Sequence, residues 1–256
     1  MSPTNKTVYL ISGSNRGIGY GLAALIAARP DTIVFAGARD PAAQSLKDLA
    51  AKHSNVHPVK LTSGDQADNE AAIAEIQKTA GRLDVIIANA GIANTMGSVA
   101  STSPSAFREH WEVNTLGPIV LFQAAHALLL ASPTGAPIFA YISTVGASMA
   151  QYYDLHAPAY GSSKAAANFL VKALDGDHPS LIAMAIHPGW VATEMGNEGA
   201  TANGLPAAPV TVEDSVKGVM SRIDGATKEK SSGRFWNFYA DKSGRPWDIP
   251  TDEIPW

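Results

Sequence analysis

Short apolar runs alternate with helical segments along almost the whole chain, and this alternation limits the possible folds more than any other feature. The runs are rich in β-branched residues, as strands are, and the segments between them are rich in Ala and Leu, as helices are. Strands are expected at 7–12, 32–37, 56–61, 83–88, 137–142, 181–186 and 234–239. Helices are expected at 20–29, 41–53, 66–80, 104–131, 159–174 and 212–223, the fourth bending near Pro118.

Strands that alternate with helices favour a parallel sheet. The run 83–88 (LDVIIA) is almost continuously apolar, as in a parallel strand buried on both faces. The pattern predicts an α/β fold with a single doubly wound parallel sheet, a Rossmann fold of about seven strands, with helices on both faces. In such sheets ligands bind at the carboxyl ends of the strands, where the strand order reverses.

No linker or internal repeat divides the chain, so a single NAD(P)-binding domain is expected over residues 1–256. Segment 194–210 is rich in Gly, Ala and Pro and has no apolar period, which predicts a flexible flap beside the substrate. Residues 240–256 are expected to form a C-terminal tail that contains Trp247, Pro250, Pro255 and Trp256.

Composition excludes several classes of function. The net charge is −4, from 19 basic and 23 acidic residues, and no basic block suggests a nucleic-acid surface. The absence of cysteine excludes disulfides and thiol catalysis, and the seven histidines lack metal-ligand spacing, so no metal is expected. No apolar run reaches roughly 18 residues, so no membrane span is expected. With a first strand beginning near Thr7, a signal peptide is not expected, and a cytoplasmic location is predicted.

A glycine-rich turn follows the first expected strand and leads directly into a helix. Its sequence is Gly13-Ser14-Asn15-Arg16-Gly17-Ile18-Gly19. Glycines let the backbone turn tightly and approach a ligand, and the amino end of a helix favours phosphate. Strand, turn and helix together therefore predict a nucleotide site, although a plain tight turn remains the alternative.

The end of the second expected strand bears on the choice of coenzyme. An acidic residue here would bind the ribose 2′-hydroxyl of NAD, whereas a basic residue suits a 2′-phosphate. The strand ends in Ala38-Arg39-Asp40, and Arg16 of the glycine turn offers a second cation. Asp40 could instead pair with Arg39 at the surface. We favour NADP(H) over NAD(H).

Tyr160 and Lys164 lie four residues apart in an expected helix, so both side chains share one face. An ammonium beside a phenol favours the phenolate and lowers the pKa of the tyrosine from its usual value near 10. Such a tyrosine could exchange a proton near neutral pH. An exposed pair without a role is the alternative. Against it, other polar or glycine-rich positions follow the ends of the expected strands: Arg39, Asn89, Ser143 and Thr193.

These motifs together resemble the short-chain dehydrogenase/reductase family, over nearly the whole chain to about Tyr239. The glycine turn is similar to the family's coenzyme turn, and Asn89-Ala90-Gly91 to the end of its Asn-Asn-Ala-Gly signature. The family's catalytic tetrad falls on Asn114, Ser143, Tyr160 and Lys164. Segment 188–193, with Pro188, Gly189, Val191 and Thr193, is similar to the part that holds the nicotinamide carboxamide.

The resemblance implies a role for each tetrad residue. Tyr160 would be the general acid in carbonyl reduction, and Lys164 would lower its pKa and hold the nicotinamide ribose. Ser143 would bind the substrate carbonyl, and Asn114 would hold a water that links Lys164 to solvent. The chemistry agrees, because hydride arriving at a carbonyl carbon leaves negative charge on oxygen, which needs a donor and then a proton.

The chain departs from the family pattern at three positions. Ala88 replaces the first Asn of the signature, and Ser12 replaces a common Thr before the glycine turn. Thr62 stands where the family usually has an Asp beside the adenine. The segment from His187 to Gly196 is similar to the branch that contains fungal norsolorinic acid ketoreductases and bacterial C-factor-like proteins. That resemblance implies an activity in secondary metabolism.

The resemblance implies an NADPH-dependent keto reductase, or an alcohol dehydrogenase in the reverse direction, that acts on an apolar or aromatic ketone. A pocket for that substrate is expected from Met96, Met149, Tyr152, Tyr153 and Trp190. A non-catalytic NADP(H) sensor or scaffold is the alternative, and an epimerase or dehydratase is a further one. The family also implies a homodimer or homotetramer.

Overall fold

The structure is a computed structural model that describes residues 5–239 and 249–256. One parallel sheet runs through it in the strand order β3-β2-β1-β4-β5-β6-β7. The strands are β1 (Thr7–Ser12), β2 (Thr32–Ala38), β3 (Val56–Lys60), β4 (Val85–Ala88), β5 (Ile138–Ile142), β6 (Ile182–His187) and β7 (Arg234–Asn237). Every neighbouring pair in this order is parallel, which confirms the predicted doubly wound sheet of seven strands.

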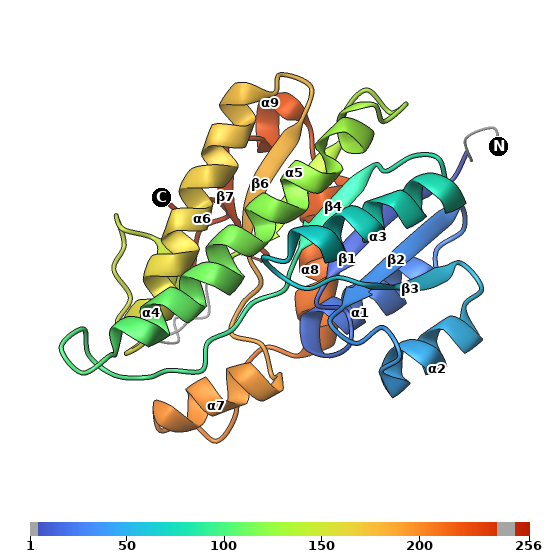
Figure 1. The fold of residues 1–256 in the computed structure, drawn as a ribbon. Helices are drawn as coiled ribbons and strands as arrows, with labels where there is room; N and C mark the ends of the chain where they lie inside the picture. The colour runs from blue at the N-terminus through green and yellow to red at the C-terminus, as the bar shows by residue number, and fades with distance from the viewer. Residues whose placement is uncertain (1–4, 240–248) are drawn as a thin grey trace.

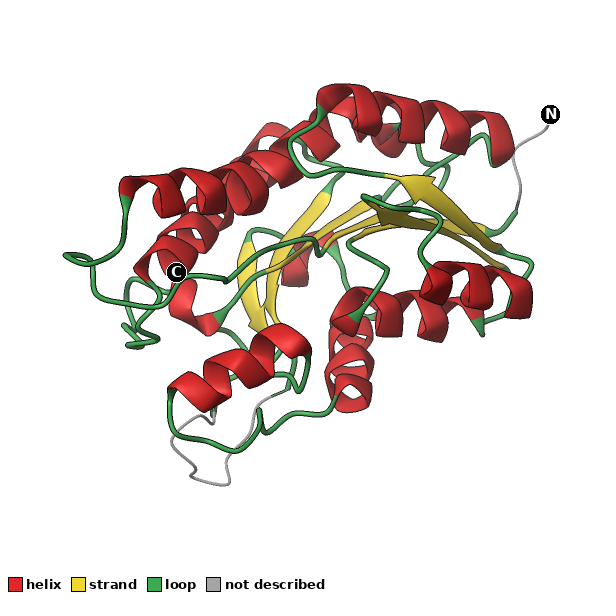
Figure 2. Cartoon of the chain, turned by 60° about the horizontal axis from the view of Figure 1, so that its bottom comes forward, coloured by secondary structure: helices red, strands yellow, loops and turns green. Residues whose placement is uncertain are grey.

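Helices cover both faces of the sheet (Figures 1 and 2). They are α1 (Gly17–Ala27), α2 (Gln44–Lys52), α3 (Gln66–Thr79), α4 (Pro104–Trp111), α5 (Gly117–Leu130), α6 (Pro158–Asp177), α7 (Glu194–Ala202), α8 (Val212–Asp224) and α9 (Lys228–Ser231). A π-helical segment, η1 (Glu112–Leu116), joins α4 to α5, and a 3₁₀ turn, η2 (Val145–Ala147), follows β5.

Two apolar cores result from the alternation of side chains along the strands. One core packs α3, α5 and α6 against one face and includes Leu10, Phe139 and Tyr141. The other packs α1, α2 and α8 against the opposite face and includes Ile11 and Ile142. All four residues of β4 are buried, as expected for a central parallel strand.

Local signals in the sequence explain where several helices begin. The side chains of Asp65, Ser103 and Thr211 each accept a hydrogen bond from a backbone amide in the first turn of α3, α4 and α8. Pro104 occupies the first turn of α4, where its missing amide hydrogen costs nothing. These caps hold the helices in place around the strand ends that they follow.

The structure differs from the sequence prediction in the helix expected over 104–131. A π-helical segment, η1, interrupts the α-helix one turn before Pro118, and whether the helix axis bends near the proline stays a prediction. Pro118 has no amide hydrogen to donate to the carbonyl of Asn114, four residues before it, so the regular helical pattern cannot continue there. The Asn114 carbonyl accepts the Tyr141 hydroxyl at 3.0 Å instead.

Segment 194–210, expected to be an irregular flap, begins with a helix. Thr193 caps α7 by accepting a hydrogen bond from the Gly196 amide. α7 stands apart from both helix layers (Figure 1), and Ala200 is its one buried residue. Its sequence therefore lacks the regular spacing of apolar residues that a helix packed on a core shows. Its helical signal is the cap rather than a pattern. Whether the segment moves stays a prediction.

The expected tail is described only over residues 249–256. There the Trp256 ring stacks on Phe235 with centroids 5.7 Å apart. The Ser148 hydroxyl donates to the Pro255 carbonyl at 2.6 Å, and the Ala150 amide donates to the Trp256 carbonyl at 3.0 Å. The tail therefore supports the loop that follows β5. Trp247 lies outside the described residues.

The helical run Pro104–Leu130 is long and apolar enough to cross a membrane by length and composition alone, contrary to the expectation that no segment would reach that length. Of the residues in its most apolar 18-residue window, 44% are buried inside the fold. Leu121, Ala125 and Leu129 belong to the core on the α3, α5 and α6 side. The core helix of a soluble protein meets the same two criteria, so the run is weak support for a span.

Candidate active site

The strand order reverses between β1 and β4, and the glycine turn lies there, at the carboxyl end of β1. Gly13 has φ +70° and Gly17 φ +55°, a left-handed backbone that favours glycine. A side chain on Gly19 would collide with the Gly13 carbonyl and the Asn89 amide. The turn is therefore built for close backbone approach, and α1 begins within it at Gly17, as a phosphate site requires.

Asn89 ties the end of β4 to this turn. Its side-chain amide donates to the carbonyls of Ser12 and Gly13 at 3.0 and 3.2 Å. The Ser12 hydroxyl accepts the amides of Asn89 and Ala90, each at 3.0 Å. The Ser12 hydroxyl thus gives the oxygen that these two amides need.

The two cations expected at the coenzyme lie in different surroundings. Arg16 is exposed and forms an ion pair with Glu194, at the start of α7. Arg39 is exposed just beyond β2 and forms no ion pair within residues 5–239 and 249–256. Asp40, weighed as its partner, instead accepts the Ala42 amide at 2.9 Å.

The remaining expected coenzyme residues lie around the same edge. The Asn15 carbonyl accepts the Ser45 hydroxyl at 2.7 Å, and Ile18 packs against the second core. Thr62 is half-buried after β3, and its carbonyl accepts the Asn69 side-chain amide at 2.9 Å. The Thr62 hydroxyl also bonds the Asp68 carboxylate, which lowers the pKa of Asp68. Thr62 is therefore held from two sides.

Segment 188–193 follows β6 and reaches toward the glycine turn. Gly189 has φ +86°, and the Pro188 carbonyl accepts the Ser215 hydroxyl at 2.7 Å. Val191 pairs in parallel with Val210, which fixes the two ends of the α7 segment side by side. A side chain on Gly17 would lie 3.2 Å from Thr193 Cγ2, so segment and turn are in contact range.

Tyr160 and Lys164 lie on one face of α6, as their spacing predicts. The Lys164 ammonium lies 5.9 Å from the centroid of the Tyr160 ring. Lys164 is 3% exposed, and its ammonium donates to the Ile142 carbonyl at 2.7 Å. Gly91 also lies close to the Lys164 ammonium. A Cβ atom added to Gly91 would lie 3.3 Å from Lys164 Nζ and 3.1 Å from Asn114 Oδ1.

Burial dominates the titration of this pair. It raises the pKa of Tyr160 to about 12, opposed by a hydrogen bond with Thr144. It lowers the pKa of Lys164 to about 7. The expected lowering of the Tyr160 pKa by Lys164 is therefore wrong for this structure. The reason is geometric: the ammonium donates to the end of β5 and not to the phenol.

Ser143 stands directly after β5, 2% exposed. Its hydroxyl donates to the side-chain carbonyl of Asn168 at 2.7 Å. Asn168 is one helical turn beyond Lys164 on α6, and its side-chain Nδ2 has no partner among the described residues. Sequence reasoning missed Asn168, although its spacing from Tyr160 and Lys164 places it on the same helix face.

Asn114 is fully buried in η1 and is held at every polar atom of its side chain. Its Oδ1 accepts the Ile92 amide at 2.8 Å, and its Nδ2 donates to the Ile92 carbonyl at 2.9 Å and to Ser163 Oγ at 3.0 Å. Its backbone carbonyl accepts the Tyr141 hydroxyl at 3.0 Å. Asn114 thus joins the loop after β4 to α6.

Apolar side chains lie exposed in the two loops beside this edge. Met96, Met149 and Tyr152 are 41%, 80% and 82% exposed, and Tyr153 is partly buried. Trp190 donates its indole N–H to the Gly196 carbonyl of α7 at 3.0 Å. Within the described residues, no group of three or more His, Cys, Asp or Glu side chains could hold a metal ion.

Comparisons with known proteins agree with this arrangement. The profile of the family described as short chain dehydrogenase matches residues 7–203. Norsolorinic acid ketoreductase nor1 of Dothistroma septosporum is 39% identical over 252 residues, which cover 95% of this chain and 94% of the relative. The norsolorinic acid ketoreductase of Aspergillus parasiticus is also 39% identical, over 96% of this chain and 93% of the relative.

Solved structures give the same result. An NADPH-bound carbonyl reductase from chicken fatty liver superposes with a TM-score of 0.80 at 30% identity, over 92% of this chain and 97% of that one. Carbonyl reductase Sniffer of D. melanogaster superposes with a TM-score of 0.83 at 27% identity, over 98% and 100%. This chain belongs to the short-chain dehydrogenase family.

Proposed function

We propose that this protein is an NADPH-dependent carbonyl reductase, which works as an alcohol dehydrogenase in the reverse direction. The observation that carries the proposal is the meeting of two elements beside the glycine turn. α6 presents Tyr160 and Lys164 on one face, and Ser143 directly follows β5. The similarity to ketoreductases and carbonyl reductases supports the same reaction.

The chain's own groups would carry the proton chemistry. Reduced nicotinamide, when bound, supplies hydride to the carbonyl carbon. The Ser143 hydroxyl would donate to the carbonyl oxygen and stabilise the negative charge that develops there. The Tyr160 hydroxyl would give its proton to that oxygen, which yields the alcohol and a phenolate. The Lys164 ammonium would have to turn from the Ile142 carbonyl toward the phenol to stabilise that phenolate.

The residues at the strand edge fit a dinucleotide. We assign its pyrophosphate to the glycine turn, because α1 begins there at Gly17 and no side-chain hydrogen bond caps its start within the described residues. Arg16 and Arg39 would bind a 2′-phosphate, since guanidinium groups match phosphate geometry and Arg39 has no competing partner among the described residues. The NADPH in the similar chicken enzyme supports this choice.

Further contacts are proposed for the rest of the coenzyme. Thr62 would lie beside the adenine, and Lys164 with Tyr160 beside the nicotinamide ribose. The groups after β4 and β6 would line the nicotinamide side: Asn89, Ala90, Gly91, Pro188, Gly189, Val191 and Thr193.

We propose that the substrate is an apolar or aromatic ketone and that the reaction belongs to secondary metabolism. The loops after β4 and β5 carry exposed Met96, Met149 and Tyr152, whose side chains would give such a substrate apolar contacts. The most similar relatives described above are named for norsolorinic acid reduction, which is consistent with a ketone substrate.

The reductase activity has a direct test. We expect NADPH consumption with members of an aromatic ketone panel, followed at the nicotinamide absorbance band. Tyr160→Phe removes the proton donor and keeps the ring, so kcat should fall by about 10²–10⁴-fold while NADPH binding persists. Tyr239→Phe, at an exposed position, serves as the matched control. Full turnover by Tyr160→Phe would refute the assigned role.

Coenzyme preference tests the two cations. Arg39→Gln should weaken NADPH binding by about 10- to 100-fold, because one charge-assisted hydrogen bond is worth roughly 1.5–3 kcal/mol. NADH affinity should change little, because NADH has no 2′-phosphate. Fluorescence titration with both coenzymes measures the ratio. An equal loss for both would contradict the assignment.

The same assays separate the alternatives. Tight NADPH binding without turnover of any carbonyl would favour a sensor or scaffold. NADP⁺ that is used and restored in each cycle, with no net consumption, would favour an epimerase or dehydratase.

A further inference from the structure

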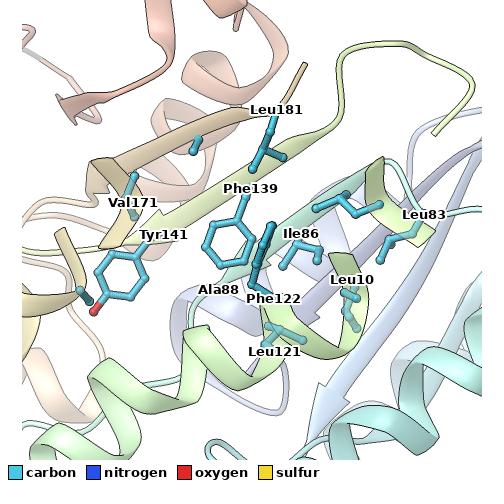
Figure 3. Packing of buried hydrophobic residues seen from close by; sticks show 14 of the residues in the cluster. Leu10, Leu83, Ile86, Ala88, Leu121, Phe122, Phe139, Tyr141, Val171 and Leu181 are labelled. Carbon is cyan, nitrogen blue, oxygen red and sulfur yellow. The ribbon is translucent and has the colours of Figure 1, made fainter. Parts of the chain in front are cut away.

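Tyr141 lies next to Lys164, the lysine proposed above to act in catalysis. It is the fourth residue of β5 and is 1% exposed, in the core between the sheet, α5 and α6. Its ring centroid lies 4.5 Å from Lys164 Nζ, closer than the 5.9 Å to the Tyr160 ring. Figure 3 shows the Tyr141 ring beside Phe139, on the same side of β5. The ammonium therefore rests on an aromatic surface that the family motif does not include.

The hydroxyl of Tyr141 has a specific partner. It donates to the Asn114 backbone carbonyl at 3.0 Å. Pro118 cannot donate to that carbonyl, so η1 leaves an acceptor that a regular helix would have used. Tyr141 thus satisfies a buried carbonyl and is held by it, which fixes the plane of the ring in the core.

The ammonium of Lys164 has few other contacts. It donates to the Ile142 carbonyl at 2.7 Å. Burial is the cause of its lowered pKa, without a contribution from a carboxylate. Two titratable side chains face the ammonium: Tyr141 from β5 and Tyr160 from α6. Asn114 from η1 also lies nearby, but its side chain is uncharged. His187 on β6 is kept neutral by burial, which lowers its pKa to about 3.

We propose that Tyr141 is a positioning residue for Lys164, whose ring binds the ammonium through a cation–π contact while its hydroxyl, anchored on the Asn114 carbonyl, keeps that ring in place. A cation over an aromatic face at this distance is attracted by the ring's electron density, and more strongly where water is excluded. The contact opposes the desolvation of Lys164 and keeps part of it charged at neutral pH. The catalytic consequence rests on the proposed function, but the contact does not.

The test replaces the ring's charge distribution and keeps its shape. Phenylalanine and its mono-, di- and trifluorinated forms are placed at position 141 by site-specific incorporation. The titration of Lys164 is followed by NMR of lysine labelled with ¹³C at Cε, with Lys164→Arg to assign the signal. The pKa of Lys164 should fall stepwise with fluorination, by about half to one pH unit in total. The same series at Phe139, on the same face of β5, is the control and should leave Lys164 unchanged.

Two further variants separate the ring from the hydroxyl. Tyr141→Phe keeps the ring and should keep the pKa of Lys164 close to its original value. Tyr141→Leu removes the ring and should lower that pKa further. A flat fluorination series would overturn the proposal even if Tyr141→Leu unfolds or shifts the pKa. The readout needs no turnover, so a failed reductase assay would refute the proposed function and leave this result readable.

Discussion

At the scale of single residues, the site depends on buried polar side chains whose protons are held in place. The Ser143 hydroxyl points its proton at Asn168 Oδ1, while Asn168 Nδ2 has no partner among the described residues. Oxygen and nitrogen of an amide exchange places by a half-turn, and the hydrogen-bond network decides between them. With Nδ2 toward Ser143, the serine proton would be free to bind a substrate oxygen. Asn168 would then be a positioning residue for Ser143.

This assignment predicts the behaviour of Asn168→Asp. A carboxylate can only accept, so it would hold the Ser143 proton, and kcat should fall by about 10²-fold, the usual cost of one lost oxyanion donor. Lowering the pH should restore activity in the variant, because a protonated carboxyl can donate again. Steady-state kinetics across pH measures both effects, with KM nearly unchanged. A variant with the original kcat and pH profile would contradict the role.

At the scale of elements, α7 is tied to the glycine turn from the far end of the sequence. The ion pair of Arg16 with Glu194 joins the turn to the first residue of α7. Both side chains are exposed, so the pair is weak on its own. Its importance lies in competition: the guanidinium proposed to bind a coenzyme phosphate is already occupied by a carboxylate.

Glu194→Gln should therefore tighten NADPH binding severalfold at low salt, because Arg16 loses its competing partner. The gain should shrink as salt screens the charges. A double-mutant cycle with Arg16→Gln gives the control, since Glu194→Gln should have no effect once Arg16 is gone. Isothermal titration at two salt concentrations measures the difference. Equal gains with and without Arg16 would contradict the competition.

At the scale of the whole molecule, the pattern of apolar residues was sufficient to predict the sheet, its strands and both helix layers. Parallel strands that are buried on both faces appear in the sequence as continuous apolar runs, which are easy to recognise. The strand predicted at 7–12 has the same bounds as β1. The helix α7 was missed because its signal is a single cap at Thr193. The contacts of Tyr141 and Asn168 were missed because they join separate elements, and spacing along one element does not report them.

The buried histidine at the end of β6 predicts how the whole fold responds to acid. His187 is 6% exposed, and its Nδ1 accepts the Val145 amide at 3.2 Å. Burial lowers its pKa to about 3, from 6.5, so the folded state resists protonation that the unfolded chain accepts. The stability is therefore present above pH 6.5 and is lost as the pH falls toward 3.

From pH 7.5 to 5, His187 should account for about 2 kcal/mol of lost unfolding free energy. His187→Gln keeps an acceptor for the Val145 amide and cannot titrate, so it should lose less stability over this range. Urea denaturation of both proteins at the two pH values measures the difference. Equal losses would show that other groups dominate.

The π turn has a consequence for chain length. A five-residue turn amounts to one residue inserted into an otherwise continuous helix. Because the wide turn absorbs that residue, deleting one residue from 112–116 should let the ladder close and leave α4 and α5 in nearly the same register. The loss would fall on the segment itself, where the Asn114 side chain bonds Ile92 and Ser163 and its carbonyl accepts the Tyr141 hydroxyl. At this position, the protein should tolerate substitutions far better than a shortening by one residue.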